Sequence, residues 1–422
     1  MKYKLSLFFS ILIFYSLEGM FSSMVLPEYA QDFRVFRFLC DILTILLAVT
    51  VFLKEGLSIT KKLLLIFILV SSCTYIFNLG KVGLLTHLNG LREPLIFFSA
   101  LIFIEHVFSS KYRNKFIKNF SIFLIVFAIS QLPATLIEFS LYGAGDKVGG
   151  TFGTIGGSGL AAMLLFLISF YLIVKYNSGT KEDTFNINKL LIISLLLIPC
   201  AFNETKITFI LLFLYFILIL DTSFQRGLFK VSFIIFFSGL FFYFFYYYYT
   251  KTVMNPLSYL NIDFINKYFF TYKIREGYIS RYAMIPEMFY VFSKNVGAYI
   301  FGIGYGIFKG QNILGTSQVG GSTFYLWYRS QILLFSTWMQ GGISFILVLF
   351  FTMFSFMKSE KKIIYSRNVK RFKLFLLFVL LIMWGYNCAI LTRTFSIIIS
   401  YFMIWSKYGK REIQPLEVEN RI

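Results

Sequence analysis

The chain has 422 residues, of which 58% are hydrophobic and only 14% are charged. A soluble domain usually carries about a quarter charged residues, so this composition excludes an ordinary soluble protein and indicates a chain that lives in lipid. The aromatic share is 21%, with 55 Phe and 28 Tyr. Phe side chains can face lipid, and Tyr side chains suit the interfacial belts of a membrane protein.

The distribution of charge, the placement of the cysteines and the small number of histidines exclude further classes of protein. The formal net charge of +20 does not indicate nucleic acid, because the basic residues sit at the ends of apolar stretches, as topology signals do. The four cysteines lie inside apolar stretches without CxxC spacing, so we expect neither a disulfide framework nor a zinc site. The only histidines are His87 and His106, and no nucleotide motif or carboxylate cluster is evident, so we expect no metal and no cofactor.

About twelve apolar stretches predict an all-α, polytopic membrane protein that forms a single membrane domain over 1–422. Lys2 and Lys4 precede the first stretch, but no convincing cleavage site follows, so we expect a helix there and not a signal peptide. The seventh and eighth stretches could instead form one long helix broken at 203–206. In chain order, the predicted helices are 5–25, 38–53, 63–79, 91–108, 120–139, 157–176, 190–202, 207–220, 231–249, 332–357, 374–391 and 394–405.

The basic residues orient these helices. With the N-terminus inside, the predicted inner segments hold 25 of the 40 Lys and Arg residues, against seven in the short outer segments. Cytoplasmic loops carry this excess of positive charge. Merging the seventh and eighth helices would place the seven basic residues of 358–373 outside. We therefore predict twelve spans with both termini in the cytoplasm.

One long polar segment, 250–329, interrupts the pattern between helices nine and ten and is predicted to lie outside the cytoplasm. It holds eight basic and three acidic residues, a balance that favours an anionic partner, although a merely solvated loop is the alternative. The basic residues are Lys251, Lys267, Lys273, Arg275, Arg281, Lys294, Lys309 and Arg329.

Two patterns stand out inside this loop. Aromatic and apolar residues at helical spacing predict a short helix on the membrane surface, from which Arg275 and Arg281 would project. The residues that set this spacing are Tyr278, Arg281, Tyr282, Ile285, Met288 and Phe289. A glycine series follows at Gly302, Gly304 and Gly306, which could bind phosphate or could allow close backbone packing in a turn.

Two charged positions outside the loop are further candidates, because ionisable residues in or near the membrane are costly and often functional. Lys206, in Asn203-Glu204-Thr205-Lys206, is predicted in the outer turn between helices seven and eight. It could bind an anionic lipid head group, or it could snorkel or pair with Glu204. Arg92 is predicted at the outer start of helix four, where a local pair with Glu93 is the alternative.

Three landmarks resemble the O-antigen polymerase and O-antigen ligase superfamily of bacterial envelope enzymes. Gly150-Thr151-Phe152-Gly153 resembles that family's entry to a helix, and Thr205-Lys206 resembles its pair between short helices. Arg281, followed by the glycine series of 301–306, resembles its loop signature. The resemblance covers roughly residues 85–350 and includes the long outer loop between helices nine and ten.

The resemblance implies a metal-independent glycosyltransferase at the outer face of the bacterial cytoplasmic membrane. Its donor and acceptor would be undecaprenyl-pyrophosphate-linked glycans, its surroundings membrane lipid, and its candidate protein partners a chain-length regulator and a flippase. Arg281 and Lys206 would hold the donor diphosphate and stabilise it as a leaving group, and Glu204 or Glu287 would be the base. The residues implied in substrate binding are Arg92, Arg275, Tyr278, Tyr282 and Arg329.

Two alternatives to a polymerase stay open. The ligase branch of the family has a histidine in the loop before helix ten, whereas this loop has no histidine and carries 322–326 in that region. That departure favours a polymerase. A non-enzymatic flippase or exporter of lipid-linked glycans is the alternative of another class. The long basic loop and the lack of an internal repeat disfavour it.

Overall fold

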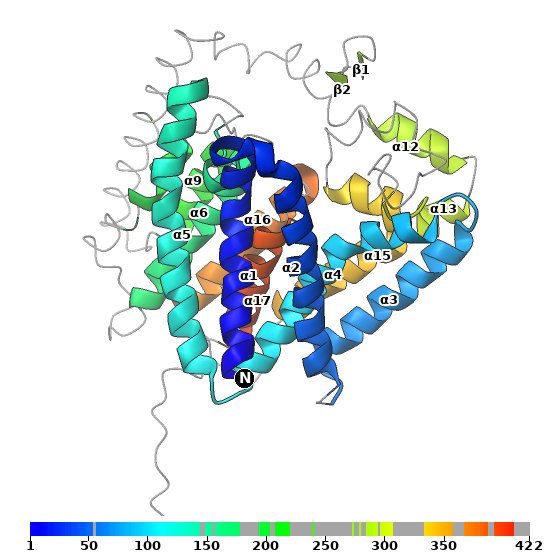
Figure 1. Cartoon of the computed structure of the whole chain (residues 1–422), viewed down its shortest axis with the longest axis horizontal. Coiled ribbons are helices and arrows are strands. Elements are labelled where there is room, and N and C mark those ends of the chain that lie inside the picture. Colours follow the sequence, from blue (N-terminus) through cyan, green and yellow to red (C-terminus); the bar gives the residue numbers. More distant parts are fainter. Residues whose placement is uncertain are drawn as a thin grey trace, which may run out of the picture.

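The computed structural model describes residues 1–53, 56–143, 148–153, 157–177, 193, 195–202, 207–219, 239, 272–273, 278–279, 284–293, 296–306, 333–357, 367–386 and 392–408. These residues are helical apart from one two-stranded pair, which confirms the all-α class (Figure 1). Six of the described helical stretches are long and apolar enough to cross a membrane. The chain is therefore a membrane protein, while the twelve-span count and the single-domain organisation stay predictions.

The described elements fall into three groups by length. Eight long helices are α1 (Lys2–Met20), α2 (Ala30–Phe52), α3 (Ile59–Phe77), α4 (Leu84–Phe108), α5 (Arg113–Tyr142), α6 (Gly157–Asn177), α15 (Leu333–Met357) and α16 (Arg367–Tyr386). Shorter α-helices are α8 (Pro199–Phe202), α9 (Ile207–Ile219), α12 (Met284–Ser293), α13 (Gly297–Phe301) and α17 (Arg393–Tyr408). The remaining elements are η1 (Phe21–Val25), η2 (Pro27–Tyr29), η3 (Gly150–Phe152), η4 (Leu195–Leu197), β1 (Tyr272–Lys273) and β2 (Tyr278–Ile279).

Four helices, α2, α4, α5 and α16, begin seven or eight residues earlier than their apolar stretches predict. Helix α2 begins at Ala30 instead of residue 38, and α4 begins at Leu84 instead of residue 91. The polar residues at these starts stop an apolar stretch but do not stop a helix, whose backbone hydrogen bonds are internal. The prediction that Arg92 lies at the start of α4 is therefore wrong. Arg92 lies about 12 Å inside the helix, at 1.5 Å per residue.

The loop prediction is wrong in one part. The helical spacing from Tyr278 onward predicted one surface helix, but the helix α12 begins only at Met284. Tyr278 lies in β2, which pairs antiparallel with β1 in the register Tyr272 with Ile279 and Lys273 with Tyr278. Tyrosine and isoleucine favour strands, so the local preference overrode the helical spacing at this end of the segment.

The seventh predicted helix, 190–202, is interrupted where the structure describes it. Residues 195–197 form the short turn η4, and a separate single α-turn, α8, begins at Pro199. Proline lacks a backbone N–H and clashes with the preceding turn, so it cannot continue a helix through this point. The ninth predicted helix, 231–249, lies outside the described residues except for Gly239.

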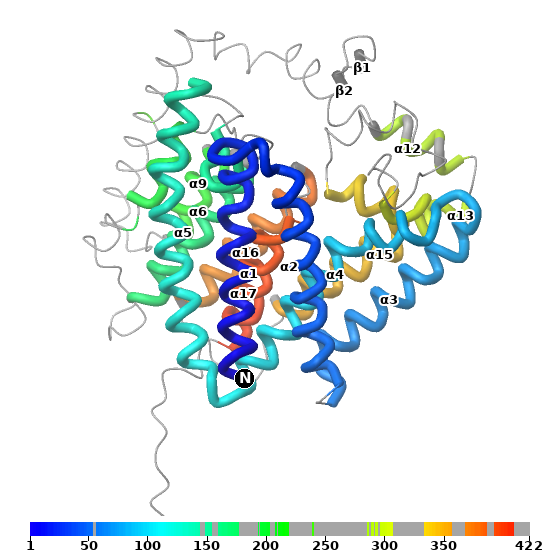
Figure 2. The backbone as a smooth tube through the Cα atoms, in the orientation of Figure 1, coloured from blue at the N-terminus to red at the C-terminus, as the bar shows by residue number. Residues whose placement is uncertain are grey.

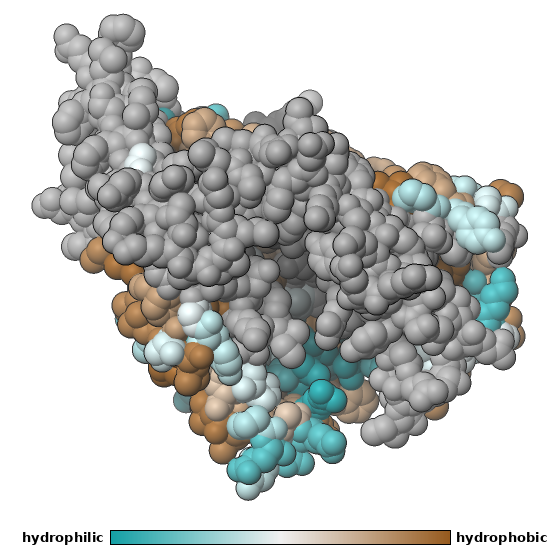
Figure 3. All heavy atoms as spheres, turned by 90° about the horizontal axis from the view of Figure 1, so that it is seen from above, coloured by the Kyte–Doolittle hydropathy of each residue, from teal (hydrophilic) through white to brown (hydrophobic). Residues whose placement is uncertain are grey.

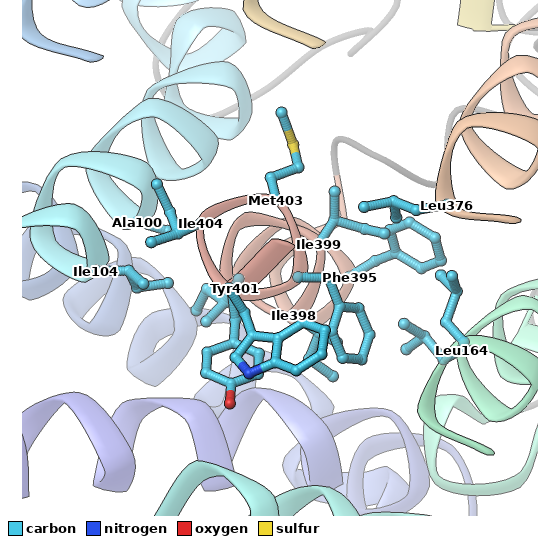
Figure 4. Close-up of a cluster of buried hydrophobic side chains, with 14 of the residues drawn as sticks. Ala100, Ile104, Leu164, Leu376, Phe395, Ile398, Ile399, Tyr401, Met403 and Ile404 are labelled. Carbon is cyan, nitrogen blue, oxygen red and sulfur yellow. The ribbon is translucent and has the colours of Figure 1, made fainter. Parts of the chain in front are cut away.

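Helix α17 is the centre of the bundle. Every residue of 394–406 is buried, although the helix is near the end of the chain. Figure 4 shows Ala100 and Ile104 of α4, Leu164 of α6 and Leu376 of α16 around it. A helix that is covered on all sides belongs to a core, whereas α2, α3 and α5 expose large apolar side chains in the manner of lipid-facing helices.

The bundle has two distinct ends. At one end, which we name the N-terminal face, Lys4 donates to Thr50 (2.7 Å) and Arg113 donates to the carbonyl of Tyr408 (2.7 Å). The start of α1 and the end of α17 therefore share this face. At the opposite end, named the loop face, lie β1, β2 and α12 (Figure 1). There α13 and α15 pack against α3, which leans away from α1 (Figure 2).

Candidate functional site

A buried carboxylate joins four helices at the centre of the candidate site. Asp41 of α2 has no exposed surface. Arg393, the first residue of α17, donates from Nε to Oδ1 (2.8 Å) and from Nη2 to Oδ2 (3.0 Å). The hydroxyl of Tyr15 on α1 also donates to Oδ1 (2.7 Å). This paired grip of a guanidinium on a carboxylate is strong and geometrically specific, so Asp41 is satisfied by these two partners alone.

Arg92 of α4 is a second guanidinium at the same carboxylate. Its Nε lies 2.8 Å from Oδ2 of Asp41, and its Cζ lies 5.2 Å from the centre of the Phe38 ring. The contact with Asp41 is an ion pair only, because this buried Nε makes no hydrogen bond in the described structure. Glu93 attracts both guanidinium groups. Asp41 and Glu93 together match the two guanidinium charges. Arg92 differs from Arg393 in that its Nε makes no hydrogen bond to Asp41.

A second ion pair lies between α1 and α2, nearer the loop face. Arg37 Nη1 is 3.0 Å from Glu18 Oε1. Two adjoining cavities of about 270 and 330 Å³ open beside this pair and share Leu26 and Phe33 in their walls. Seen from the loop face, hydrophilic residues gather at the lower edge of the molecule beside an apolar flank (Figure 3). Charge and apolar surface thus meet at this end of the bundle.

The Gly150–Phe152 turn, η3, is held by two polar residues of α5. Gln131 accepts from the Thr151 N–H (3.1 Å) and donates to the Thr151 hydroxyl (2.5 Å). Glu138 accepts from the Gly150 N–H through Oε2 (2.5 Å). Gly150 has a φ of +64°, and a Cβ there would lie 2.3 Å from the Gln131 side chain. Only glycine fits this position, which explains the first residue of the landmark.

Glu138 itself is an unusual group. Its side chain has no exposed surface, yet its second oxygen, Oε1, makes no hydrogen bond in the described structure. Burying an acceptor without a partner is costly, so such an atom needs an explanation.

The turn packs against α1, and its neighbour on α5 is close to the end of α8. The backbone of Phe152 packs directly against Gly19 of α1, where a Cβ would lie 2.3 Å from the Phe152 carbonyl oxygen. Phe202, the last described residue before 203–206, has its ring 5.0 Å from that of Phe139, the neighbour of Glu138. The Gly150–Phe152 turn and Phe202 of α8 therefore both contact the loop-face end of α5.

The glycine series of the loop supports close backbone packing. Gly302, Gly304 and Gly306 all have positive φ, at 69°, 112° and 80°. The N–H groups of residues 303 and 304 donate to the carbonyls of residues 339 and 340 in α15 (2.7 and 3.1 Å). A Cβ on Gly90 of α4 would lie 2.1 Å from the Gly306 nitrogen. Backbone donors that a phosphate loop would need are thus already used in holding this segment to α15.

Most predicted site residues cannot be placed. Lys206, Glu204, Arg275, Arg281, Tyr282 and Arg329 lie outside the described residues. Tyr278 lies in β2 and Glu287 in α12, and the side chains of both lie outside the description. Arg92 alone is placed with its contacts, and its ion-pair partner in the structure is Asp41 of another helix.

Three carboxylates of the described helices are absent from the predicted site residues. Asp41, Glu18 and Glu138 all lie within predicted apolar stretches, where an ionisable residue is itself a signal of a site. The predicted site residues lie instead at the ends of apolar stretches and in the long loop. Among the described residues, no group of three or more His, Cys, Asp or Glu side chains could hold a metal ion.

Comparison of the chain with family models, with curated proteins and with solved structures gave no match. The landmarks and the geometry at the loop face are therefore the basis for a functional proposal.

Proposed function

We propose that the chain is a membrane-embedded glycosyltransferase that polymerises lipid-diphosphate-linked oligosaccharide repeat units at the outer face of the bacterial cytoplasmic membrane. The observation that carries the proposal is the guanidinium of Arg92, which Asp41 and the Phe38 ring hold in place while part of its side chain stays exposed. It adds to the order of the three landmarks along the chain.

A guanidinium in this setting suits a diphosphate. Arginine is always charged and presents a planar set of donors that matches phosphate oxygens. Asp41 and the Phe38 ring hold Arg92, while 19% of its side chain stays exposed. Phosphate oxygens arriving at that exposed part would meet a cation that is oriented in advance, so little ordering is needed on binding.

A polymerase needs two such cationic regions. The donor reacts at the sugar carbon that carries its diphosphate, whereas the acceptor reacts at a hydroxyl remote from its own diphosphate. The two diphosphates must therefore lie apart at the same membrane face. In this proposal Lys206 and Arg281 hold the donor diphosphate. Arg92 holds the acceptor diphosphate.

The proposal includes a membrane orientation in which the N-terminal face lies in the cytoplasm and the loop face lies outside. The asymmetry of Lys and Arg between inner and outer segments supports this orientation. Reporter fusions after Ser178 and after Glu360 are expected to read cytoplasmic, and a fusion after Asn312 is expected to read outside. The same compartment for Ser178 and Asn312 would contradict the twelve-span arrangement.

Purified protein supplied with lipid-linked repeat units tests the activity directly. We expect a ladder of longer lipid-linked chains in detergent, where no membrane gradient exists to drive export. A flippase would leave the repeat units unextended. In cells, deleting the gene is expected to leave single repeat units without a ladder, whereas long polymers stranded on the lipid carrier would indicate a ligase instead.

A further inference from the structure

Two adjoining cavities open beside the turn that joins α1 to α2. They have volumes of about 270 and 330 Å³ and share Leu26 and Phe33 in their walls. The walls are formed by α1, α2 and the turn between them, and all but two of the wall residues are leucine or aromatic. The two exceptions are carboxylates, Glu18 in the first cavity and Asp32 in the second. We name this apolar site with two carboxylates the α1–α2 groove.

A wide helical turn contributes to this groove. The residues Phe21–Val25 form the π-helical turn η1, and the N–H of Leu26 donates to the carbonyl of Phe21 (2.8 Å). Turns of this kind contain an extra residue and are frequent at functional sites. Phe21 and Leu26 both line the groove, and the ring of Phe21 stacks on that of Phe33 with 6.3 Å between their centres. The wide turn therefore supplies part of the groove wall, and ring stacking joins it to α2.

The groove is open to the lipid around the bundle. In the most apolar parts of the spans Lys2–Val25 and Pro27–Phe52, only 33% and 28% of the residues are buried. Figure 1 shows α1 and α2 side by side at the front of the bundle. Leu26, which both cavities share, and Phe36 of the second cavity are exposed. An acyl chain of the bilayer can therefore enter the groove from the side without displacing a described part of the protein.

The charged residues of the groove lie at two depths. Asp32 is exposed and lies about 3 Å along α2 from its first residue, whereas Arg37 lies about 10 Å along it, at 1.5 Å per residue. Arg37 pairs with Glu18 in the groove wall (Nη1 to Oε1, 3.0 Å), and 30% of its side chain stays exposed. The head-group layer of a bilayer is about 5–8 Å thick on each side. The guanidinium therefore lies deeper than the Asp32 carboxylate, near the level where head groups meet acyl chains.

We infer that the α1–α2 groove binds an aminophospholipid of the surrounding membrane, an inference that does not depend on the proposed function. An acyl chain of the lipid occupies the apolar cavities, its phosphate meets the exposed part of Arg37, and its amine pairs with Asp32. A guanidinium matches phosphate oxygens, and a carboxylate accepts hydrogen bonds from an amine. A phospholipid without an amine would bring its negative charge to Asp32 with no compensating cation, so the groove selects against it.

Phosphatidylethanolamine and phosphatidylglycerol with the same acyl chains test the inference. The two lipids share the phosphate and the chains, and only the first carries an amine. The purified, delipidated full chain is titrated with each lipid in detergent, and native mass spectrometry measures the fraction with bound lipid. We expect the parent to bind phosphatidylethanolamine about fivefold more tightly, the upper end for a partly exposed ion pair. Thermal unfolding without lipid shows whether each variant is folded.

Three substitutions locate the site. Asp32→Asn keeps the size of the side chain but removes its charge, and it should reduce the preference to within about twofold. Glu28→Gln is the matched control, because Glu28 is an exposed carboxylate of the same segment that lines neither cavity, and it should keep the parent's preference. Leu26→Trp fills the space at the wall that both cavities share, and it should weaken the binding of both lipids by about tenfold.

Equal affinity of the parent for the two lipids overturns the inference, and so does a preference that Asp32→Asn retains in full. Loss of the preference in Glu28→Gln as large as in Asp32→Asn also overturns it, because the effect would then come from surface charge in general. Binding of both lipids to folded Leu26→Trp with the parent's affinity would place the acyl chain outside the groove. Leu26→Phe replaces Leu26→Trp if that variant does not fold, with an expected loss of about threefold.

Discussion

Two regions of the bundle use buried charge in different ways. At the N-terminal face, Lys61 donates to the carbonyls of Val51 and Phe52 (3.3 and 3.0 Å), which end α2. Arg113 likewise donates to the carbonyl of Tyr408, the last residue of α17. Farther along the bundle, at the middle of α2, two guanidinium groups share the Asp41 carboxylate. Toward the loop-face end of α5, Glu138 keeps an oxygen without a hydrogen bond in the described structure.

The difference has a physical meaning. The last carbonyls of a helix have no partner within the helix and carry its partial negative charge, so a cation placed there completes a structure. Lys61 and Arg113 do this, and they join α3 to α2 and α5 to α17. At Asp41, by contrast, Arg92 adds a second guanidinium to a carboxylate that Arg393 already binds through two hydrogen bonds. A charge retained inside a membrane protein beyond structural need is a reason to expect a ligand.

Asp41→Ala is expected to have the largest effect on stability. It would leave Arg92 and Arg393 without their shared counter-charge, and breaking a buried ion pair on one side costs about 3–5 kcal/mol. Chemical unfolding in mild detergent measures the loss. The double variant Asp41→Ala with Arg393→Met is the control and should regain part of it. Stability within 0.5 kcal/mol of the parent for Asp41→Ala would show that the cluster contributes nothing to folding.

Gly90→Ala tests the contact between α4 and the glycine series of the loop. The new Cβ would lie 2.1 Å from the backbone nitrogen of Gly306, so one of the two segments must shift. We expect a loss of about 3 kcal/mol, at the upper end for overpacking. Gly83→Ala is the matched control, because its Cβ would meet nothing closer than 3.9 Å. Equal melting temperatures for the two variants would contradict the packing described here.

Lys61→Met tests the N-terminal face, where we expect buried cations to stabilise the fold and to take no part in polymerisation. The side chain is only 2% exposed, and its loss would leave the α2 carbonyls with one charged donor fewer. The expected cost is about 2 kcal/mol. Lys62→Met, on the exposed neighbour, should cost less than about 0.5 kcal/mol. Polymer formation should persist in both. Loss of polymer from a folded Lys61→Met protein would contradict the claim that the buried cations of the N-terminal face serve only the fold.

The sequence predicts the elements that depend on apolar length. Helix α6 begins at Gly157 and α15 ends at Met357, as predicted, because long apolar stretches in lipid must form helices. The starts of α2, α4, α5 and α16 are predicted seven or eight residues too late, because polar residues end an apolar stretch without ending a helix. Asp41 is a partner for Arg92 only after α2 and α4 have packed, and no local pattern reports that pairing.

The landmarks also separate what a local pattern predicts from what only the fold determines. The glycines of 150–153 and of 302–306 could be recognised as positions that need glycine, but their neighbours could not. Gly150 faces Gln131, and Gly306 faces Gly90, each from a different part of the chain. Of the predicted substrate residues, Arg92 could be found from its charge within a polar helix start. Its ion-pair partner Asp41 also binds Arg393, which is 352 residues away from Asp41 in sequence, so the three meet only in the fold.

The central claim is that Arg92 serves the substrate whereas Arg393 serves the fold, and comparing Arg92→Gln with Arg393→Gln tests it most directly. Turnover of lipid-linked repeat units and thermal stability would be measured on the same purified samples. We expect Arg92→Gln to fold normally and to lose about 30- to 1,000-fold in kcat/KM, the effect of removing about 2–4 kcal/mol of charge-assisted binding. Arg393→Gln is expected to lower the thermal stability more than Arg92→Gln does, because Asp41 would lose both hydrogen bonds from the Arg393 guanidinium. Full turnover by Arg92→Gln, or destabilisation equal to that of Arg393→Gln, would contradict the account.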